Sequence, residues 1–116
     1  MGKYLRFEDL EIWKEAMKIC IEIYELLKDC KDYGLKDQMQ RSAVSIPSNI
    51  AEGYERKGSK ETIQFFYFSK GSCGELRTQL YLAIYLKYID KNKGNELIDR
   101  LLTLSRKIYK FIQTIN

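Results

Sequence analysis

The stretch RSAVSIPSNIAEG, residues 41–53, contains the only proline of the chain inside a segment that otherwise has the periodicity of a helix. Apolar residues recur at helical spacing through it, at Leu35, Met39, Ala43, Ile46 and Ile50. Gly53 stands where a residue in the left-handed conformation would close the helix. We therefore predict a helix over residues 34–53 that bends at Pro47.

The proline also raises the question of what satisfies the backbone around it. Pro47 removes one amide donor and displaces the carbonyl four residues earlier, which costs about 3 kcal/mol unless nearby groups compensate. Ser45, Ser48 and Asn49 are close enough in the sequence to do so. We interpret the segment as a kinked packing helix, and the alternative is a polar binding site.

Hydrophobic periodicity predicts three further helices, over about residues 8–31, 59–89 and 92–115. A chain of 116 residues is long enough for one core, and no segment has the composition of a linker. The expected fold is all-α: an antiparallel, up-and-down four-helix bundle that forms a single domain over residues 1–116.

Two adjacent apolar rows run along the first helix and again along the last. A helix in a bundle needs an apolar face of about three residues in seven, so a second row predicts burial against another subunit. We expect a homo-oligomer on this ground, and the alternative is a wide stripe that packs wholly within one chain. A third row on the first helix, mainly acidic and including Glu15 and Glu22, is interpreted as its solvated face.

The helix predicted over 59–89 contains two interior glycines, each costing about 1 kcal/mol relative to alanine. They share one helical row with four tyrosines: Tyr67, Gly71, Gly74, Thr78, Tyr81, Tyr85 and Tyr88. Glycines kept at this cost indicate the close approach of a neighbouring helix, so we interpret the row as an interface. The alternative is a platform on which unpaired bases stack.

Composition argues against several classes of protein. The longest uncharged runs are about half of the roughly 20 residues that cross a bilayer, so we expect no membrane span. Three cysteines without a C-x-x-C pair, and no histidine, predict a cytoplasmic chain with no metal and no cofactor. Histidine is the commonest general base, and no P-loop or dinucleotide fingerprint is present. We expect no enzymatic activity and no catalytic residues, and a carboxylate-based magnesium nuclease is the formal alternative.

The formal net charge is +4, and the excess of basic residues lies toward the C-terminus. Four basic side chains of the last helix fall within about a third of its circumference, opposite the leucine rows: Arg100, Arg106, Lys107 and Lys110. Closely spaced cations favour polyanions through counterion release. These four residues are therefore candidates for binding nucleic acid.

A second basic group lies in the turn that opens the helix over 59–89, and consists of Arg56, Lys57 and Lys60. The free amides and the positive end of a helix can receive a phosphate at such a position. We include these three residues in the candidate nucleic-acid site. For both groups, ordinary solvated surface is the alternative interpretation.

The segment around Pro47 resembles the S-I-P-x-N-I-A-E-G core of a family of four-helix-bundle proteins encoded by intervening sequences of bacterial 23S ribosomal RNA genes. FEDLEIWKEA, residues 7–16, resembles the opening F-x-x-L-x-x-W-x-x-A of that family, and GSCGEL, residues 71–76, resembles its small-residue patch in the third helix. The resemblance spans about residues 7–90, because the last helix matches only in length and amphipathicity. It implies a compact bundle that assembles into a ring-like homopentamer, with no established catalytic residues.

Two non-enzymatic functions are compatible with these features. In the first, an oligomeric bundle binds RNA or DNA without sequence specificity through its basic strips, since no groove-reading motif is present. The resembled family supports it, being similar to the pentameric accessory proteins of diversity-generating retroelements, which partner a reverse transcriptase and nucleic acid. In the second, the protein is an interaction scaffold whose basic face docks an acidic protein partner without nucleic acid.

Overall fold

The computed structural model describes residues 6–115, which form four long helices and one short 3-10 helix. Their bounds are η1 Phe7–Asp9, α1 Glu11–Leu26, α2 Tyr33–Tyr54, α3 Ser59–Tyr85 and α4 Lys91–Gln113. No strand occurs in the described range, and the molecule measures 45 × 21 × 20 Å. The all-α, single-domain fold expected from the sequence is confirmed.

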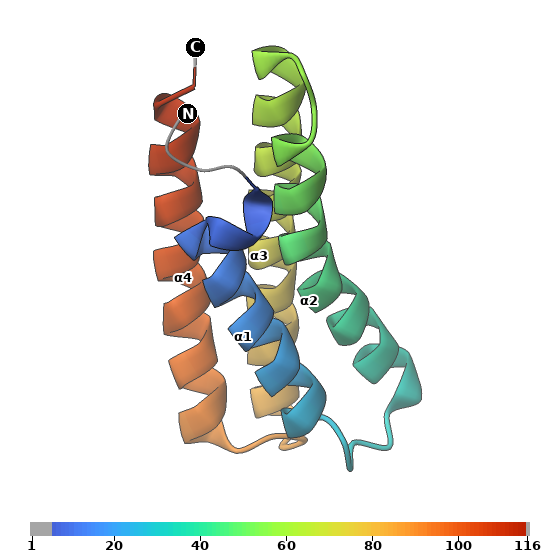
Figure 1. Cartoon of the computed structure of the whole chain (residues 1–116). Helices are drawn as coiled ribbons and strands as arrows, with labels where there is room; N and C mark the ends of the chain where they lie inside the picture. Colours follow the sequence, from blue (N-terminus) through green and yellow to red (C-terminus); the bar gives the residue numbers. More distant parts are fainter. Residues whose placement is uncertain (1–5, 116) are drawn as a thin grey trace.

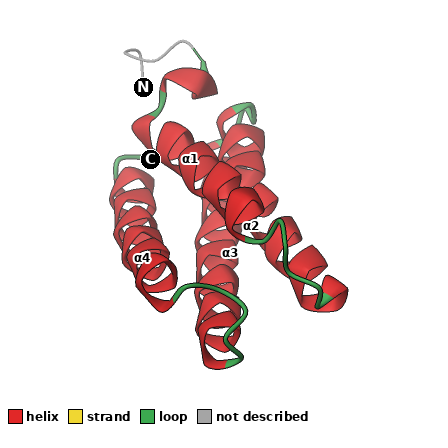
Figure 2. Ribbon diagram, turned by 90° about the horizontal axis from the view of Figure 1, so that it is seen from below, coloured by secondary structure: helices red, strands yellow, loops and turns green. Residues whose placement is uncertain are grey.

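Short connections at the ends of the bundle join consecutive helices, and the chain runs back and forth between them (Figure 1). Each helix contacts its neighbours in the sequence, and contacts between α1 and α4 close the bundle. Seen from below, α3 lies between α2 and α4 (Figure 2). The turn between α2 and α3 and the C-terminal end of α4 lie at the same end of the molecule, the top of Figure 1.

Local signals account for where several helices begin and end. The Asp32 side chain accepts a hydrogen bond from the backbone amide of Leu35, and Asp90 caps α4 in the same way at Lys93. α3 ends at Tyr85, earlier than the predicted 89, and Lys87 beyond it takes a positive φ of 63°. α1 ends at Leu26 rather than near 31.

Gly53 does not end α2, so the predicted role of this glycine was wrong. The helix continues to Tyr54, and no glycine in the described range has a positive φ. Gly53 is instead buried against α3, where an added Cβ would lie 2.9 Å from the ring of Phe66. Its carbonyl accepts a hydrogen bond from the Thr62 hydroxyl at 2.8 Å. The glycine is required by the close approach of two helices.

Pro47 is buried within α2, and polar groups from both helices lie beside it. The Ser69 hydroxyl of α3 donates to the carbonyl of Ile46 at 2.9 Å. The amide of Asn49 donates to the carbonyl and the hydroxyl of Ser45, each at 2.9 Å. The first turns of α2 lean away from the bundle in Figure 1, as expected for a helix bent near its middle.

The double apolar rows of α1 and α4 pack mostly within the single chain, so they no longer indicate a second subunit. Both rows supply buried core residues: Ile12, Ala16, Ile19, Cys20 and Ile23 from α1, and Leu97, Ile98, Leu101, Leu104, Ile108 and Ile112 from α4. Exposed apolar surface is concentrated on α3 instead. Its tyrosine row faces outward, with Tyr67, Tyr81 and Tyr85 exposed by 45%, 59% and 83%.

Replacing Gly53 tests the close packing of α2 on α3. We expect Gly53→Ala to destabilise the fold by about 1 to 3 kcal/mol, because the added methyl group overlaps a buried aromatic ring. Gly34→Ala is the matched control, since the added Cβ at position 34 makes only ordinary contact at 3.8 Å. It should leave stability unchanged or raise it by up to about 1 kcal/mol. Urea unfolding followed by circular dichroism measures both, and equal effects would contradict the packing.

Candidate functional site

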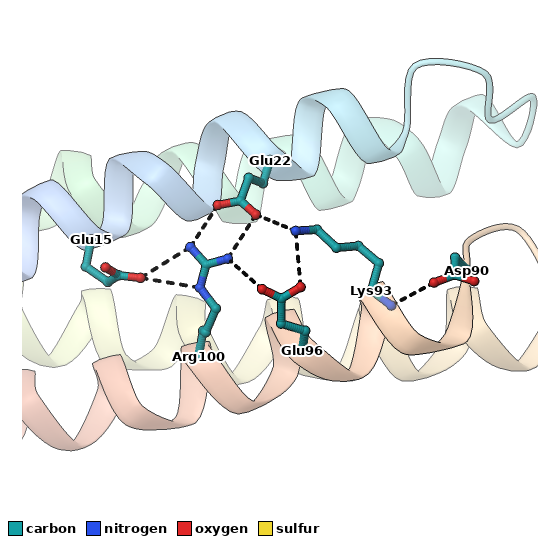
Figure 3. Close-up of polar contacts among 6 residues, drawn as sticks. All are labelled: Glu15, Glu22, Asp90, Lys93, Glu96 and Arg100. Atoms are coloured by element: carbon teal, nitrogen blue, oxygen red, sulfur yellow. Dashed lines mark hydrogen bonds and ion pairs between the residues drawn. The ribbon is translucent and has the colours of Figure 1, made fainter.

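An ion-pair network joins α1 to α4 and is centred on Arg100 (Figure 3). The guanidinium of Arg100 donates to both carboxylate oxygens of Glu22, at 2.9 and 2.8 Å, and to Glu15 at 3.3 Å. Lys93 donates to Glu22 at 2.6 Å and lies 3.2 Å from Glu96, which also contacts Arg100. We call these five residues the α1–α4 network.

The network shifts the acid–base properties of its members. Hydrogen bonding from Arg100, with a further contribution from Lys93, lowers the pKa of Glu22 to about 2. The same contact with Glu22 raises the pKa of Arg100. The side chains of Glu22 and Arg100 are each 26% exposed, so water screens the interaction only in part.

This geometry changes the interpretation of two sets of residues. Arg100, predicted to belong to a free basic strip, is surrounded by three carboxylates, and its charge is compensated within the chain. Glu15 and Glu22, predicted to lie on a solvated face, are half-buried partners of α4. Glu15 of α1 contacts Arg100, and Glu22 contacts both Arg100 and Lys93.

Three basic residues in the second half of α4 have different surroundings from Arg100. Arg106, Lys107 and Lys110 are all exposed, and no acidic residue occurs from position 100 to 116. Among residues 6–115, no carboxylate forms an ion pair with any of the three. We call these three residues the α4 basic strip.

The second predicted basic group is partly neutralised. Arg56 forms an ion pair with Glu52 one turn earlier, and its guanidinium lies 4.8 Å from the ring centroid of Phe65. Lys57, in the turn between α2 and α3, and Lys60, in the first turn of α3, are both exposed. This turn lies at the same end of the molecule as the C-terminal end of α4 (Figure 1).

Sequence reasoning missed a further cation, Lys70, on α3. Its ammonium donates to the hydroxyl of Ser105 at 2.8 Å and to the Ser105 carbonyl at 3.3 Å. It also lies 5.7 Å from the ring centroid of Tyr109. The ammonium is half-buried, yet no carboxylate of the described residues pairs with it. The available signal was the position of Lys70 at helical spacing between the apolar residues Phe66 and Cys73.

The polar residues beside Pro47 form a hydrogen-bonded cluster of hydroxyl and amide groups. The hydroxyls of Ser45 and Ser72 share a hydrogen bond of 2.6 Å, and Asn49 completes the cluster. A hydroxyl nucleophile needs a base within hydrogen-bond reach, and the hydrogen bonds of the Ser45 hydroxyl among residues 6–115 are to a hydroxyl and an amide. Within residues 6–115, no group of three histidine, cysteine or acidic side chains is placed to hold a metal ion. No helix in the same range has the length and hydrophobicity to cross a membrane.

Comparison with known proteins places the fold. A family model described as 23S rRNA-intervening sequence protein matches residues 8–110. A crystal structure of a protein of unknown function, from the S23 ribosomal protein family of Bacteroides thetaiotaomicron VPI-5482, superposes with a TM-score of 0.82. That structure is 18% identical in sequence, and the alignment covers 87% of this chain and 97% of the other, so it supports the fold alone. No curated protein matches the chain.

The pKa of Glu22 generates a prediction about acid stability. A carboxylate with a lowered pKa stabilises the folded state above its ordinary pKa, and this contribution is lost as the pH falls from about 5 to about 2. We expect the wild type to lose about 1 to 2 kcal/mol more than Glu22→Gln over this range, allowing for solvent screening. Urea unfolding at several pH values measures the difference.

The control is Glu25→Gln, because Glu25 is exposed on the same helix and forms no ion pair within the described residues. This variant should follow the wild type throughout. If Glu22→Gln also follows the wild type across the acid range, the network does not contribute to stability.

Proposed function

Because the chain belongs to the family of 23S rRNA-intervening sequence proteins, we propose that it is a non-enzymatic, homo-oligomeric bundle that binds RNA or DNA without sequence specificity. The observation that carries this proposal is the α4 basic strip of Arg106, Lys107 and Lys110. No carboxylate among residues 6–115 forms an ion pair with these three neighbouring cations, which leaves their charge available to a polyanion. Arg100 is left out of the contact surface because its charge is compensated.

We propose that the binding surface extends beyond the α4 basic strip at the same end of the molecule. Lys57, in the turn between α2 and α3, and Lys60, in the first turn of α3, lie at this end too (Figure 1). They provide a secondary contact, since Glu52, Glu55 and Glu61 in the same segment offset much of their charge. Phosphate contacts of this kind fix a nucleic acid on the surface without reading its sequence.

The outward-facing row of α3 supports the homo-oligomer. Monomeric proteins rarely leave several large apolar side chains exposed in one row. Gly71 lies in this row, and a Cβ added there would meet nothing within 4 Å, so the space is open to a helix of another chain. We propose that the antiparallel bundle is the subunit of a ring, with five copies as the family resemblance implies. Assembly multiplies the α4 basic strip and raises the local potential.

The proposed protein acts by binding alone, in a reducing compartment. No cofactor is required for binding through charge, and no residue is assigned a catalytic role. Cys20, Cys30 and Cys73 are all free thiols, which supports a reducing compartment such as the cytoplasm.

Neutralising the strip tests the binding surface. We expect Arg106→Gln, Lys107→Gln and Lys110→Gln, made together, to weaken RNA and DNA binding. The slope of log affinity against log salt should fall by about 2 to 3, since each lost phosphate contact contributes about 0.7 to 0.9. Fluorescence anisotropy with a labelled structured RNA and a duplex DNA, titrated across salt with heparin as competitor, measures both effects.

The matched control replaces Lys28, Lys31 and Lys91 with glutamine, which removes the same charge from exposed positions at the opposite end of the bundle. This control should bind as the wild type does. If both triple variants lose the same affinity, binding depends on net charge alone and not on the α4 basic strip. Absence of binding by the wild type at low salt would contradict the proposal and favour an acidic protein partner.

A charge placed in the outer row of α3 tests the assembly. We expect wild-type protein to have a light-scattering mass that is a multiple of 13.8 kDa, and Tyr81→Glu to lower it toward one chain. A carboxylate buried at an interface without a partner disfavours association. Tyr33→Glu is the control, because Tyr33 is 68% exposed on the first turn of α2. A wild-type mass equal to one chain would contradict the oligomer.

A further inference from the structure

We propose that Tyr109 stacks on an unpaired base, so that the surface around the α4 basic strip binds single-stranded nucleic acid in preference to a duplex. This inference rests on the proposed function and names the class of nucleic acid. It is carried by the placement of one exposed aromatic ring between cations from two helices.

Tyr109 is held on the surface of α4 and is 43% exposed. On a helix, residues three or four apart are neighbours, and Arg106 lies three positions before Tyr109. Lys110 follows Tyr109 directly and neighbours Arg106 at a spacing of four. Tyr109 therefore neighbours Arg106 on the helix surface, and Lys110 extends the basic surface along the same part of α4.

Lys70 of α3 is the second cation next to the Tyr109 ring. Its ammonium is tethered to Ser105, one turn before Tyr109, and lies 5.7 Å from the ring centroid. Neutral hydroxyl and carbonyl groups satisfy its hydrogen bonds without cancelling its charge. A half-buried cation with no carboxylate partner favours the approach of an anion, and a phosphate next to a stacked base supplies one.

An aromatic side chain flanked by cations fits a single strand better than a duplex. In a duplex, the flat faces of the bases are covered by neighbouring base pairs, whereas an unpaired base offers a free face to an aromatic ring. Lys70, Arg106 and Lys110 then contact the backbone on either side. Tyr67, Tyr81 and Tyr85 in the outer row of α3 are more exposed, but that row contains no basic residue.

Substitution of the ring tests the inference with three probes: a labelled single-stranded oligonucleotide, a strand with the same backbone but abasic sites, and the corresponding duplex. Tyr109→Ala should weaken binding of the base-bearing strand by about 5- to 150-fold and leave binding of the abasic strand and the duplex nearly unchanged. Tyr109→Phe should retain wild-type affinity. Tyr24→Ala is the matched control, because Tyr24 is also 43% exposed but lies on α1.

A second variant tests the role of the α3 cation. Lys70→Gln should lower the salt slope for the single strand by about 0.7, the contribution of one phosphate contact. Circular dichroism shows whether each variant retains the helical fold, and Tyr109→Phe and Lys70→Gln remain informative if Tyr109→Ala does not fold.

The outcomes separate this inference from the proposed function. Equal affinity of the wild type for base-bearing and abasic strands would overturn base stacking while leaving binding through charge intact. So would equal losses by Tyr109→Ala for all three probes. If the wild type binds none of the probes at low salt, both the inference and the proposed function fail.

Discussion

Closure of the bundle depends on the contact between its first and last helices, and Arg100 is the centre of that contact. Glu15 and Glu22 on α1 and Glu96 on α4 all form ion pairs with Arg100. Glu22 also pairs with Lys93. Helices α2 and α3 are held together by close packing, with Gly53 against Phe66 and hydroxyl groups bonded to carbonyls. The α1–α4 contact adds the polar interactions that fix which turns of the two helices meet.

The α1–α4 network also determines which basic residues of α4 keep a positive charge available for binding. It pairs Glu15 and Glu22 of α1 with two of the three basic residues in the first half of α4, Lys93 and Arg100. The second half of α4 has no acidic residue, so Arg106, Lys107 and Lys110 keep uncompensated charge at one end of the molecule. The same division explains why a modest net charge of +4 can produce a concentrated basic surface. Apolar surface is separated from it, on the outer row of α3.

Much of the fold could be predicted from periodicity, because each helix buries a regular apolar face. The α3 helix was predicted to begin at Ser59 and does so, and the caps at Asp32 and Asp90 involve only local contacts. Contacts between helices were harder to predict. Gly53 has the pattern of a helix end, and only its position against Phe66 reveals a packing role. Glu22 was predicted to lie on a solvated face and Arg100 in a basic strip that binds nucleic acid. Glu15 and Glu22, like Lys93 and Arg100, are spaced by seven, and this spacing could have indicated matched faces.

The measurement that tests the account most directly is lysine footprinting by chemical acetylation and mass spectrometry, with and without a single-stranded RNA. The account predicts that RNA protects Lys107, Lys110 and Lys70, with weaker protection at Lys57 and Lys60. Lysines at the opposite end, including Lys28, Lys31 and Lys91, should react equally in both samples. Protection confined to the opposite end, or spread evenly over all lysines, would contradict a nucleic-acid surface on the second half of α4.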